Sequence, residues 1–290
     1  MQRIIKMIKY ICRSCASQNI SSLGKLPTMN SFAGKPLMVS FAESSLYKCN
    51  DCSMLARHPV LTEAQYNKLY AASDADVWRS NSLQLRKDQQ IARSIIMSQY
   101  QNCCSVLDIG CYTGDLLASL PDRFSKNAVE MSENASRVAE SKAINIVGKN
   151  LYEIDTDFKF DLIVAIDVIE HTINPAEFLL YLAGFLKPNG AILISTGNAD
   201  NWVWERTKNK FWYSSFYEHI SFISQTWLAA FCDDNGYSVI NLRKFCYAEL
   251  NFKSFIKASV GIALTIFGFK TQRFSNFSKD HFCFLIKAKA

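Results

Sequence analysis

The stretch that decides the fold is SVLDIGCYTGDLLASL, residues 105–120. Its first part, residues 105–109, is a short apolar run that predicts a β-strand, and a turn containing Gly110 and Gly114 follows. The leucines after the turn recur at helical spacing. A strand, a glycine-containing loop and a helix in this order are typical of the opening of a doubly wound α/β domain. The glycines let the backbone approach a ligand, and the start of the helix offers free N–H groups.

Strand and helix patterns alternate downstream of this loop. This alternation predicts a parallel sheet that binds ligands at the carboxyl ends of its strands. The strand predicted at 127–131 contains Glu130, whose carboxylate can accept both ribose hydroxyls of an adenosine-type ligand. The other expected elements are a helix at 133–142, a short strand at 145–147, a buried strand at 160–166, a helix at 175–186, the turn KPNG at 187–190 and a strand at 191–195.

These motifs, in this order, resemble those of class I S-adenosylmethionine-dependent methyltransferases. The first motif of that family, an acidic residue followed by alternating glycines, is matched by Asp108, Gly110 and Gly114. Tyr112 stands in place of the middle glycine. Glu130 matches the ribose-binding acid of the family, and the DVIEH run at residues 167–171 and the KPNG turn match later motifs.

The resemblance implies both a fold and a cofactor. The implied fold is a doubly wound, mostly parallel, seven-stranded Rossmann-like sheet in which strands six and seven pair antiparallel. The implied cofactor is S-adenosylmethionine, bound by Asp108, Gly110, Cys111, Gly114, Glu130, Asn150 and Asp167. A dinucleotide dehydrogenase is the alternative for the glycine loop taken alone, because such a loop is a weak signal by itself.

Four cysteines near the N-terminus form two C-x-x-C pairs, Cys12 with Cys15 and Cys49 with Cys52. Each pair can place two thiolates on one ion, and four thiolates are a ligand set that tetrahedral zinc prefers. We therefore predict a closed, structural zinc site that stabilises a segment too small to fold on its own core. The alternatives are four unrelated thiols or a redox pair, although neither pair follows a strand-to-helix turn.

The cysteine-bearing segment 12–70 resembles the zinc-binding module that precedes some methyltransferases of sugar and polysaccharide biosynthesis. The matching features include CRSC at 12–15, KCNDC at 48–52 and the tyrosines Tyr66 and Tyr70. This resemblance implies O- or C-methylation of a sugar or nucleotide-linked sugar. The expected organisation is a small zinc-ribbon-like module at 1–72, a linker and lead-in helix at 73–103, and a methyltransferase domain at 104–290 with an insertion at about 246–280.

A weakly acidic acceptor needs a general base beyond the strand ends. His171 closes the DVIEH run, and His219 precedes an amphipathic helix predicted at 225–235. The resemblance implies that a histidine at the position of His219, before this helix, faces the acceptor. We predict both as catalytic candidates, with a structural, hydrogen-bonded role as the alternative for each. The residues predicted to bind the acceptor are Tyr112, Tyr213 and Tyr217.

The insertion contains an apolar helix predicted near 252–267 and flanked by lysines. We expect a core or lid role for it. A dimer contact and a peripheral membrane contact through 252–269 are the alternatives. The oligomeric state is left open.

Neither of the two most apolar stretches near the ends of the sequence has the pattern of a targeting or membrane-spanning segment. Lysines interrupt residues 1–11, and the run at 255–269 is shorter than the roughly 20 residues of a membrane span. We therefore expect a cytoplasmic protein.

Charge is distributed unevenly along the 290 residues, whose formal net charge is +6. Residues 1–100 carry +7, residues 101–200 carry −7 and residues 201–290 carry +6. The acidic middle suits a donor with a sulfonium cation, and the basic flanks favour an anionic acceptor such as a phosphate-linked sugar. Nucleic acid is not the expected partner. An RNA base methyltransferase is the enzymatic alternative, and a zinc-containing interaction module on a degenerate methyltransferase core is the non-enzymatic one.

Overall fold

The main sheet has seven strands, in a computed structural model that describes residues 10–27, 31–32, 35–36, 43–71, 84–102, 104–247, 252–267 and 278–289. The strands are β6 (Cys104–Ile109), β7 (Phe124–Val129), β8 (Asn145–Gly148), β9 (Phe160–Ile166), β10 (Leu186–Gly197), β12 (Tyr237–Phe245) and β13 (His281–Ala288). Their order across the sheet is β12-β13-β10-β9-β6-β7-β8. β13 pairs antiparallel with β10 and β12, and the remaining pairs are parallel. The predicted doubly wound, mostly parallel sheet is confirmed.

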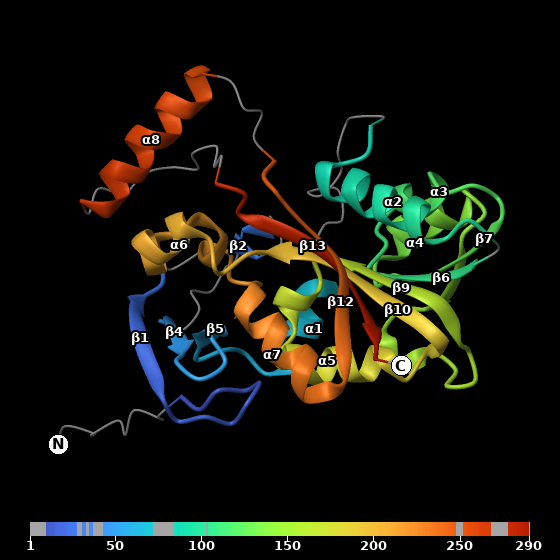
Figure 1. Cartoon of the computed structure of the whole chain (residues 1–290), viewed down its shortest axis with the longest axis horizontal. Coiled ribbons are helices and arrows are strands. Elements are labelled where there is room, and N and C mark those ends of the chain that lie inside the picture. Colours follow the sequence, from blue (N-terminus) through green and yellow to red (C-terminus); the bar gives the residue numbers. More distant parts are fainter. Residues whose placement is uncertain are drawn as a thin grey trace.

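Helices cover both faces of this sheet (Figure 1). One face is covered by α5 (Pro175–Ala183) and α7 (Gln225–Asn235), and the other by α2 (Lys87–Gln99), α3 (Asp115–Ala118) and α4 (Glu133–Glu140). The pleat of β9 explains the two layers: Ile163 packs in the core on the α5 side, and Leu162 and Val164 pack in the core on the α2 side.

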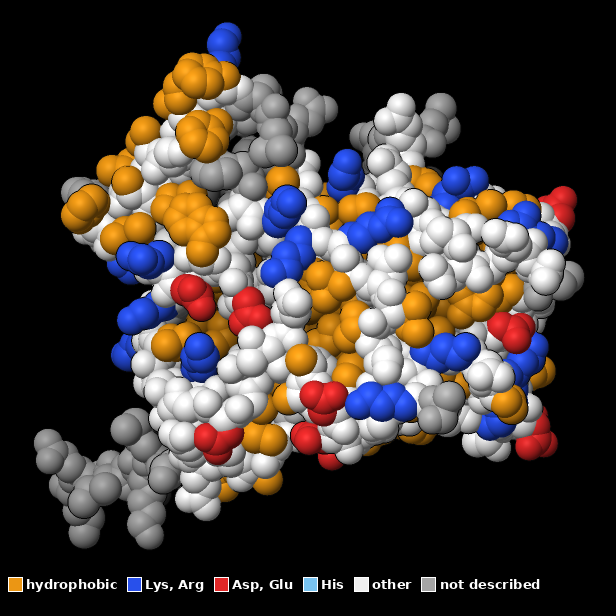
Figure 2. Space-filling view, in the orientation of Figure 1, with side chains coloured by type: hydrophobic (Ala, Val, Ile, Leu, Met, Phe, Trp, Pro, Cys, Tyr) orange, Lys and Arg blue, Asp and Glu red, His pale blue; other side chains and the backbone are white. Residues whose placement is uncertain are grey.

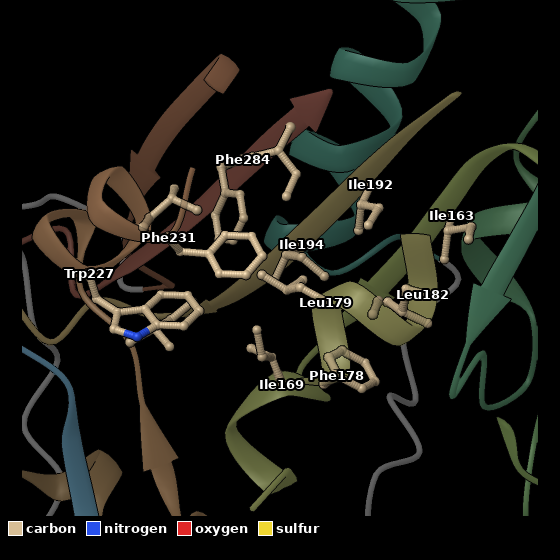
Figure 3. Close-up of a cluster of buried hydrophobic side chains, with 14 of the residues drawn as sticks. Ile163, Ile169, Phe178, Leu179, Leu182, Ile192, Ile194, Trp227, Phe231 and Phe284 are labelled. Atoms are coloured by element: carbon tan, nitrogen blue, oxygen red, sulfur yellow. The ribbon is translucent and has the colours of Figure 1, made fainter. Parts of the chain in front are cut away.

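Aromatic and aliphatic side chains fill the layer beneath α5 and α7 (Figure 3). Phe178 and Leu182 of α5 and Trp227 of α7 pack against Ile194 and Phe284 of the sheet. Because protein interiors are close-packed, this layer holds the sheet, and with it the loops that follow the carboxyl ends of its strands, in a fixed position.

A second, four-stranded sheet has the order β1-β4-β5-β11. Its strands are β1 (Ile20–Lys25), β4 (Ser45–Cys49), β5 (Leu55–His58) and β11 (Ser221–Phe222). Since β11 lies far downstream in the chain, the cysteine-bearing segment and the larger sheet domain share this sheet. A short hairpin of β2 (Ser31–Phe32) and β3 (Lys35–Pro36) completes the described strands.

Several elements differ from the predicted bounds. The KPNG residues fall within the bounds of β10, but they bulge out of its pairing with β9, which passes from Leu186–Phe160 to Ala191–Leu162, and Asn189 has a positive φ of 66°. Glu130 follows β7 and does not lie within it. The helix expected at 225–235 is present with the same bounds as α7. The linker at 73–82 lies outside the described residues.

The remaining helices of the described chain lie outside these two layers. They are α1 (Glu63–Ala71), η2 (Leu151–Glu153), η3 (Ile169–His171), α6 (Trp202–Thr207), η4 (Lys208–Lys210), η5 (Trp212–Ser215) and α8 (Phe252–Ile266). α8 is the helix expected within the insertion, and it stands at the periphery, far from α5 and α7 (Figure 1). Within the described ranges, no helix combines the length and the apolar character that crossing a bilayer requires.

Candidate active site

A cavity of about 960 Å³ lies at the carboxyl ends of β6, β7 and β9. Gly110, Glu130 and Asp167, each of which directly follows one of these strands, line it. Parallel strands present their carboxyl ends at one edge of a sheet, so residues far apart in sequence meet there. The other predicted cofactor residues in the lining are Asp108, Cys111 and Asn150.

The carboxylate of Glu130 is held by two backbone N–H groups. Its Oε2 accepts a hydrogen bond from the amide of Tyr112 at 2.8 Å, and its Oε1 accepts one from the amide of Ser132 at 2.8 Å. Burial raises the pKa of Glu130, and these N–H groups oppose that shift by stabilising the charged form. A carboxylate offers about four lone-pair positions, so it can also accept hydrogen bonds from a bound ligand.

The loop after β6 depends on backbone conformation. Gly114 has φ of 72° and does not line the cavity; a Cβ there would lie 2.2 Å from Cδ1 of Ile144. Gly114 therefore permits close packing of the loop against the following elements. Tyr112, at the position where the family has glycine, also has a positive φ of 53°, and it lines the cavity. The tyrosine thus adopts the backbone conformation that glycine adopts at lower cost.

Acidic side chains surround one part of the cavity. Burial, together with the nearby Glu130 carboxylate, raises the pKa of Asp108 to about 8. Burial also raises the pKa of Asp167 to about 7, although the Arg86 guanidinium opposes this shift. Arg86 donates to Asp167 Oδ2 at 3.0 Å and to the buried Asp88 at 2.6 Å. Such a site favours a cation, because a positive charge stabilises carboxylates that burial has destabilised.

One wall of the cavity contains both candidate histidines. Nδ1 of His219 lies 2.9 Å from the backbone carbonyl oxygen of Tyr213. Nδ1 of His171 lies 2.9 Å from Oη of Tyr70 and 3.0 Å from the backbone oxygen of Glu218. The two imidazole rings meet edge to face, with centroids 5.0 Å apart. Burial lowers the pKa of both histidines, and that of His219 falls well below its usual range.

The two predicted acceptor-side tyrosines of this wall lie in different places. Tyr213 lines the cavity, and its hydroxyl donates to Glu170 Oε1 at 2.5 Å. Tyr217 is absent from the described lining, and its ring packs against the guanidinium of Arg57 at 4.9 Å. Tyr217 therefore supports the wall from behind.

Arg57 of β5 fixes the segment that carries His219. It donates to the backbone oxygens of His219 at 3.1 Å, Ser214 at 2.8 Å and Phe216 at 2.9 Å. The side chain is fully buried, and burial lowers its pKa to about 10, so it stays charged at neutral pH. One side chain of the N-terminal segment thus holds three carbonyls beside the cavity.

Comparison with known proteins agrees with this geometry. A family model described as a methyltransferase domain matches residues 69–242. The chain belongs to this family. The match includes α2 and ends within β12, so β13 of the methyltransferase domain lies beyond it.

Relatives of this methyltransferase domain match only part of their own length. A ubiquinone biosynthesis O-methyltransferase of Bradyrhizobium diazoefficiens is 34% identical over 128 residues, which cover 40% of this chain and 47% of the relative. A mitochondrial ubiquinone biosynthesis O-methyltransferase of Dictyostelium discoideum is 33% identical over 113 residues, which cover 32% of this chain and 35% of the relative. The chain therefore spans less than half of the length of either relative.

Solved structures show distant likenesses. A methyltransferase from Thermotoga maritima, described as a possible histamine N-methyltransferase, has 16% identity and a TM-score of 0.46, and the match covers 70% of this chain and 89% of that one. A putative methyltransferase from Bacillus halodurans has 15% identity and a TM-score of 0.48, with coverage of 69% and 98%.

Sequence reasoning missed several polar residues of the lining, among them Arg86, Glu170 and Glu218. Glu170 lies inside the DVIEH run, and Glu218 directly precedes His219, so position alone could have indicated both. Glu170 is buried, and its Oε2 accepts from Thr196 at 2.9 Å. Arg86 lies in a polar stretch before α2 that carries no motif.

The four cysteines of the predicted zinc site meet in one cluster. Cys12 Sγ lies 3.6 Å from Cys52 Sγ, Cys15 Sγ lies 3.5 Å from Cys49 Sγ, and all four sulfur atoms lie within 4.8 Å of one another. Zinc–sulfur bonds of about 2.3 Å in a tetrahedron place sulfur atoms about 3.8 Å apart. The donor set and spacing fit a zinc ion bound by four thiolates.

Proposed function

We propose that the protein transfers a methyl group from S-adenosylmethionine to a hydroxyl group of a small-molecule acceptor. The observation that carries this proposal is the arrangement of one cavity. Its lining contains Asp108 and Glu130 as well as His219. Membership of the methyltransferase-domain family supports the reaction class. The names of the relatives, which are O-methyltransferases, support oxygen as the methylated atom.

The residues of the acidic part fit the donor. Glu130 would hold the ribose hydroxyls, Asn150 would contact the adenine, and Asp108 and Asp167 would face the cationic end. Arg86 lines the cavity with a partly exposed side chain, so its guanidinium would face the carboxylate of the methionine portion. The cavity thus offers a partner for each charged or polar part of the donor.

His219 is the base in this proposal. S-adenosylmethionine supplies an electrophilic methyl group on a sulfonium cation. A carbonyl oxygen can only accept, so Nδ1 of His219 carries the proton that it donates to Tyr213, and Nε2 keeps its lone pair. That nitrogen takes the proton of the acceptor hydroxyl as the oxygen–methyl bond forms and the sulfur–methyl bond breaks. His171, held by Tyr70 and Glu218, positions the wall.

The acceptor site is lined by aromatic side chains, among them Trp212, Tyr213 and Phe216. Such rings pack well against a flat phenolic ring or the apolar face of a sugar. The ubiquinone-biosynthesis relatives favour an aromatic hydroxyl compound. A sugar or nucleotide-linked sugar, suggested by the resemblance of the N-terminal segment, is the second candidate.

We also propose a structural zinc ion on Cys12, Cys15, Cys49 and Cys52. Three of these cysteines are buried, and they belong to the core cluster that includes Trp227 of α7. Four protein thiolates leave no open position, so the ion would stabilise the fold and would not activate water.

Isothermal titration with S-adenosylmethionine and S-adenosylhomocysteine is the first test, followed by transfer of labelled methyl to matched panels of phenols and nucleotide-sugars. We expect saturable donor binding and label in one of the panels. Absence of donor binding by folded, zinc-loaded protein would refute the proposal. Label found on carbon or nitrogen would refute the assignment to oxygen.

A further inference from the structure

Helix α8 exposes an unusually apolar surface. Seven large apolar residues in this helix or directly after it are exposed, with 41% to 80% of each residue accessible to solvent. They are Phe252, Phe255, Ile256, Val260, Leu264, Ile266 and Phe267. These side chains appear in Figure 2 as an orange band along the helix, at the upper left. A contiguous apolar surface of this kind marks an interaction site.

Only one stripe of the helix is buried in the described structure. Ala258, Ile262 and Thr265 recur at helical spacing and face the rest of the chain. Ile262 packs in a core cluster with Trp204, and Nζ of Lys210 donates to the backbone oxygen of Thr265 at 3.4 Å. The exposed apolar side chains lie around the opposite side, so packing in the protein does not require them to be apolar.

Charge points to the occupant. The sequence of α8 contains Lys253 and Lys257 and no acidic residue. These lysines, one turn apart, share a flank of the helix and border its apolar face. The adjoining segment of α6 and η4 adds Arg206, Lys208 and Lys210 against the single acid Glu205. An apolar face bordered by cations matches an anionic lipid surface.

A second copy of the chain fits this face less well. Two copies joined through α8 would bring lysines together, and the helix has no acid to pair with them. The length of α8 is also suited to lying on a bilayer. Its 15 residues span about 22 Å, which is less than the hydrocarbon thickness of about 30 Å.

We propose that α8 docks the protein on anionic membranes by lying in the lipid–water interface, with its apolar face inserted. This inference goes beyond the proposed reaction and does not depend on it.

Vesicle flotation tests the proposal with the full-length, zinc-loaded chain. The probes are vesicles of phosphatidylcholine alone and vesicles that also contain phosphatidylglycerol. The wild type should float with the anionic vesicles, and Phe252→Ser/Phe267→Ser should lower the bound fraction at least about ten-fold. Lys253→Gln/Lys257→Gln should abolish the preference for anionic vesicles. The control Ile240→Ser, which changes a 46% exposed residue of β12, should bind like the wild type.

Light scattering and donor binding complete the test. Thermal melting shows whether each variant folds. Folded variants should also bind S-adenosylhomocysteine like the wild type. Failure of the wild type to float, or unchanged flotation of the folded double phenylalanine variant, would overturn the proposal. A wild-type dimer that the double phenylalanine substitution dissociates without lipid would assign the face to a second copy instead.

Discussion

Nδ1 of His219 lies 2.9 Å from the backbone carbonyl oxygen of Tyr213, which fixes the orientation of the imidazole and leaves the lone pair on Nε2. Burial keeps the ring neutral, because it holds the pKa of His219 well below the usual range. His219→Ala should therefore lower kcat by about 10²- to 10⁴-fold, with little change in donor affinity. Single-turnover rates and calorimetry would measure both quantities. An unchanged kcat would exclude His219 as the base.

Tyr213→Phe provides a matched comparison, because it keeps the backbone carbonyl that binds His219. It removes the hydroxyl that donates to Glu170 and accepts from the amide of Gly197 at 3.2 Å. We expect the free energy of unfolding to fall by about 1–3 kcal/mol, with a smaller loss of kcat than in His219→Ala. Urea unfolding and steady-state kinetics would measure these effects. Equal losses of kcat in both variants would place the hydroxyl itself in the reaction.

Donor affinity should depend on pH in a defined direction. With pKa values of about 8 for Asp108 and about 7 for Asp167, the free site is partly protonated at neutral pH. A sulfonium cation favours the charged carboxylates, so binding releases protons and tightens as pH rises from about 6 to about 8. S-adenosylhomocysteine, which lacks the sulfonium charge, should show a weaker dependence. Calorimetry in buffers of different ionisation enthalpy would reveal identical behaviour of the two ligands if this account is mistaken.

Gly114→Ala should be more harmful than Gly236→Ala, although both glycines have positive φ values, 72° and 71°. No atom lies within 4 Å of a Cβ built at Gly236, so that variant bears only backbone strain, about 1 kcal/mol. At Gly114 the added Cβ meets Ile144 at 2.2 Å, and we expect about 2–4 kcal/mol of destabilisation together with loss of donor binding. Unfolding curves of equal midpoint would contradict the packing role of Gly114.

Zinc content should distinguish clustered from isolated cysteines. Cys49→Ser removes one of the four clustered sulfur atoms and should abolish stoichiometric zinc and lower the melting temperature. Cys232→Ser changes a buried cysteine outside the cluster and should retain one zinc ion per chain. Elemental analysis after gel filtration would measure both. Equal zinc content in the two variants would remove the metal assignment.

Local patterns predicted the centre of the fold correctly. The apolar run, the glycine loop and the helix after it appear as β6, the loop from Gly110 to Gly114 and α3. The periodicity of residues 225–235 predicted α7, because its buried residues recur at helical spacing and Ser224 caps its start. These features depend on neighbours in the chain, which the sequence displays directly.

Long-range pairing was not predictable in the same way. β11 is only two residues long, and it is a strand because Ser221 and Phe222 pair with Ala56 and Leu55 of β5. Nothing in its sequence indicates that partner. Arg86 likewise gains its place in the cavity from its ion pair with Asp167, 81 residues away. The KPNG residues resemble a turn locally, and they do bulge out of the pairing with β9, but β10 begins before them at Leu186, where the pattern did not indicate a strand.

Arg57 couples the N-terminal segment to the wall of the cavity, so the two parts depend on each other's structure. Its bonds to the carbonyls of Ser214, Phe216 and His219 require the guanidinium and that particular wall to match. A chimera that receives the cysteine-bearing segment of a relative but keeps its own residues 214–222 would combine two parts that do not fit each other at this contact. Recombination between relatives should therefore preserve activity only when the segment around β11 is exchanged along with it.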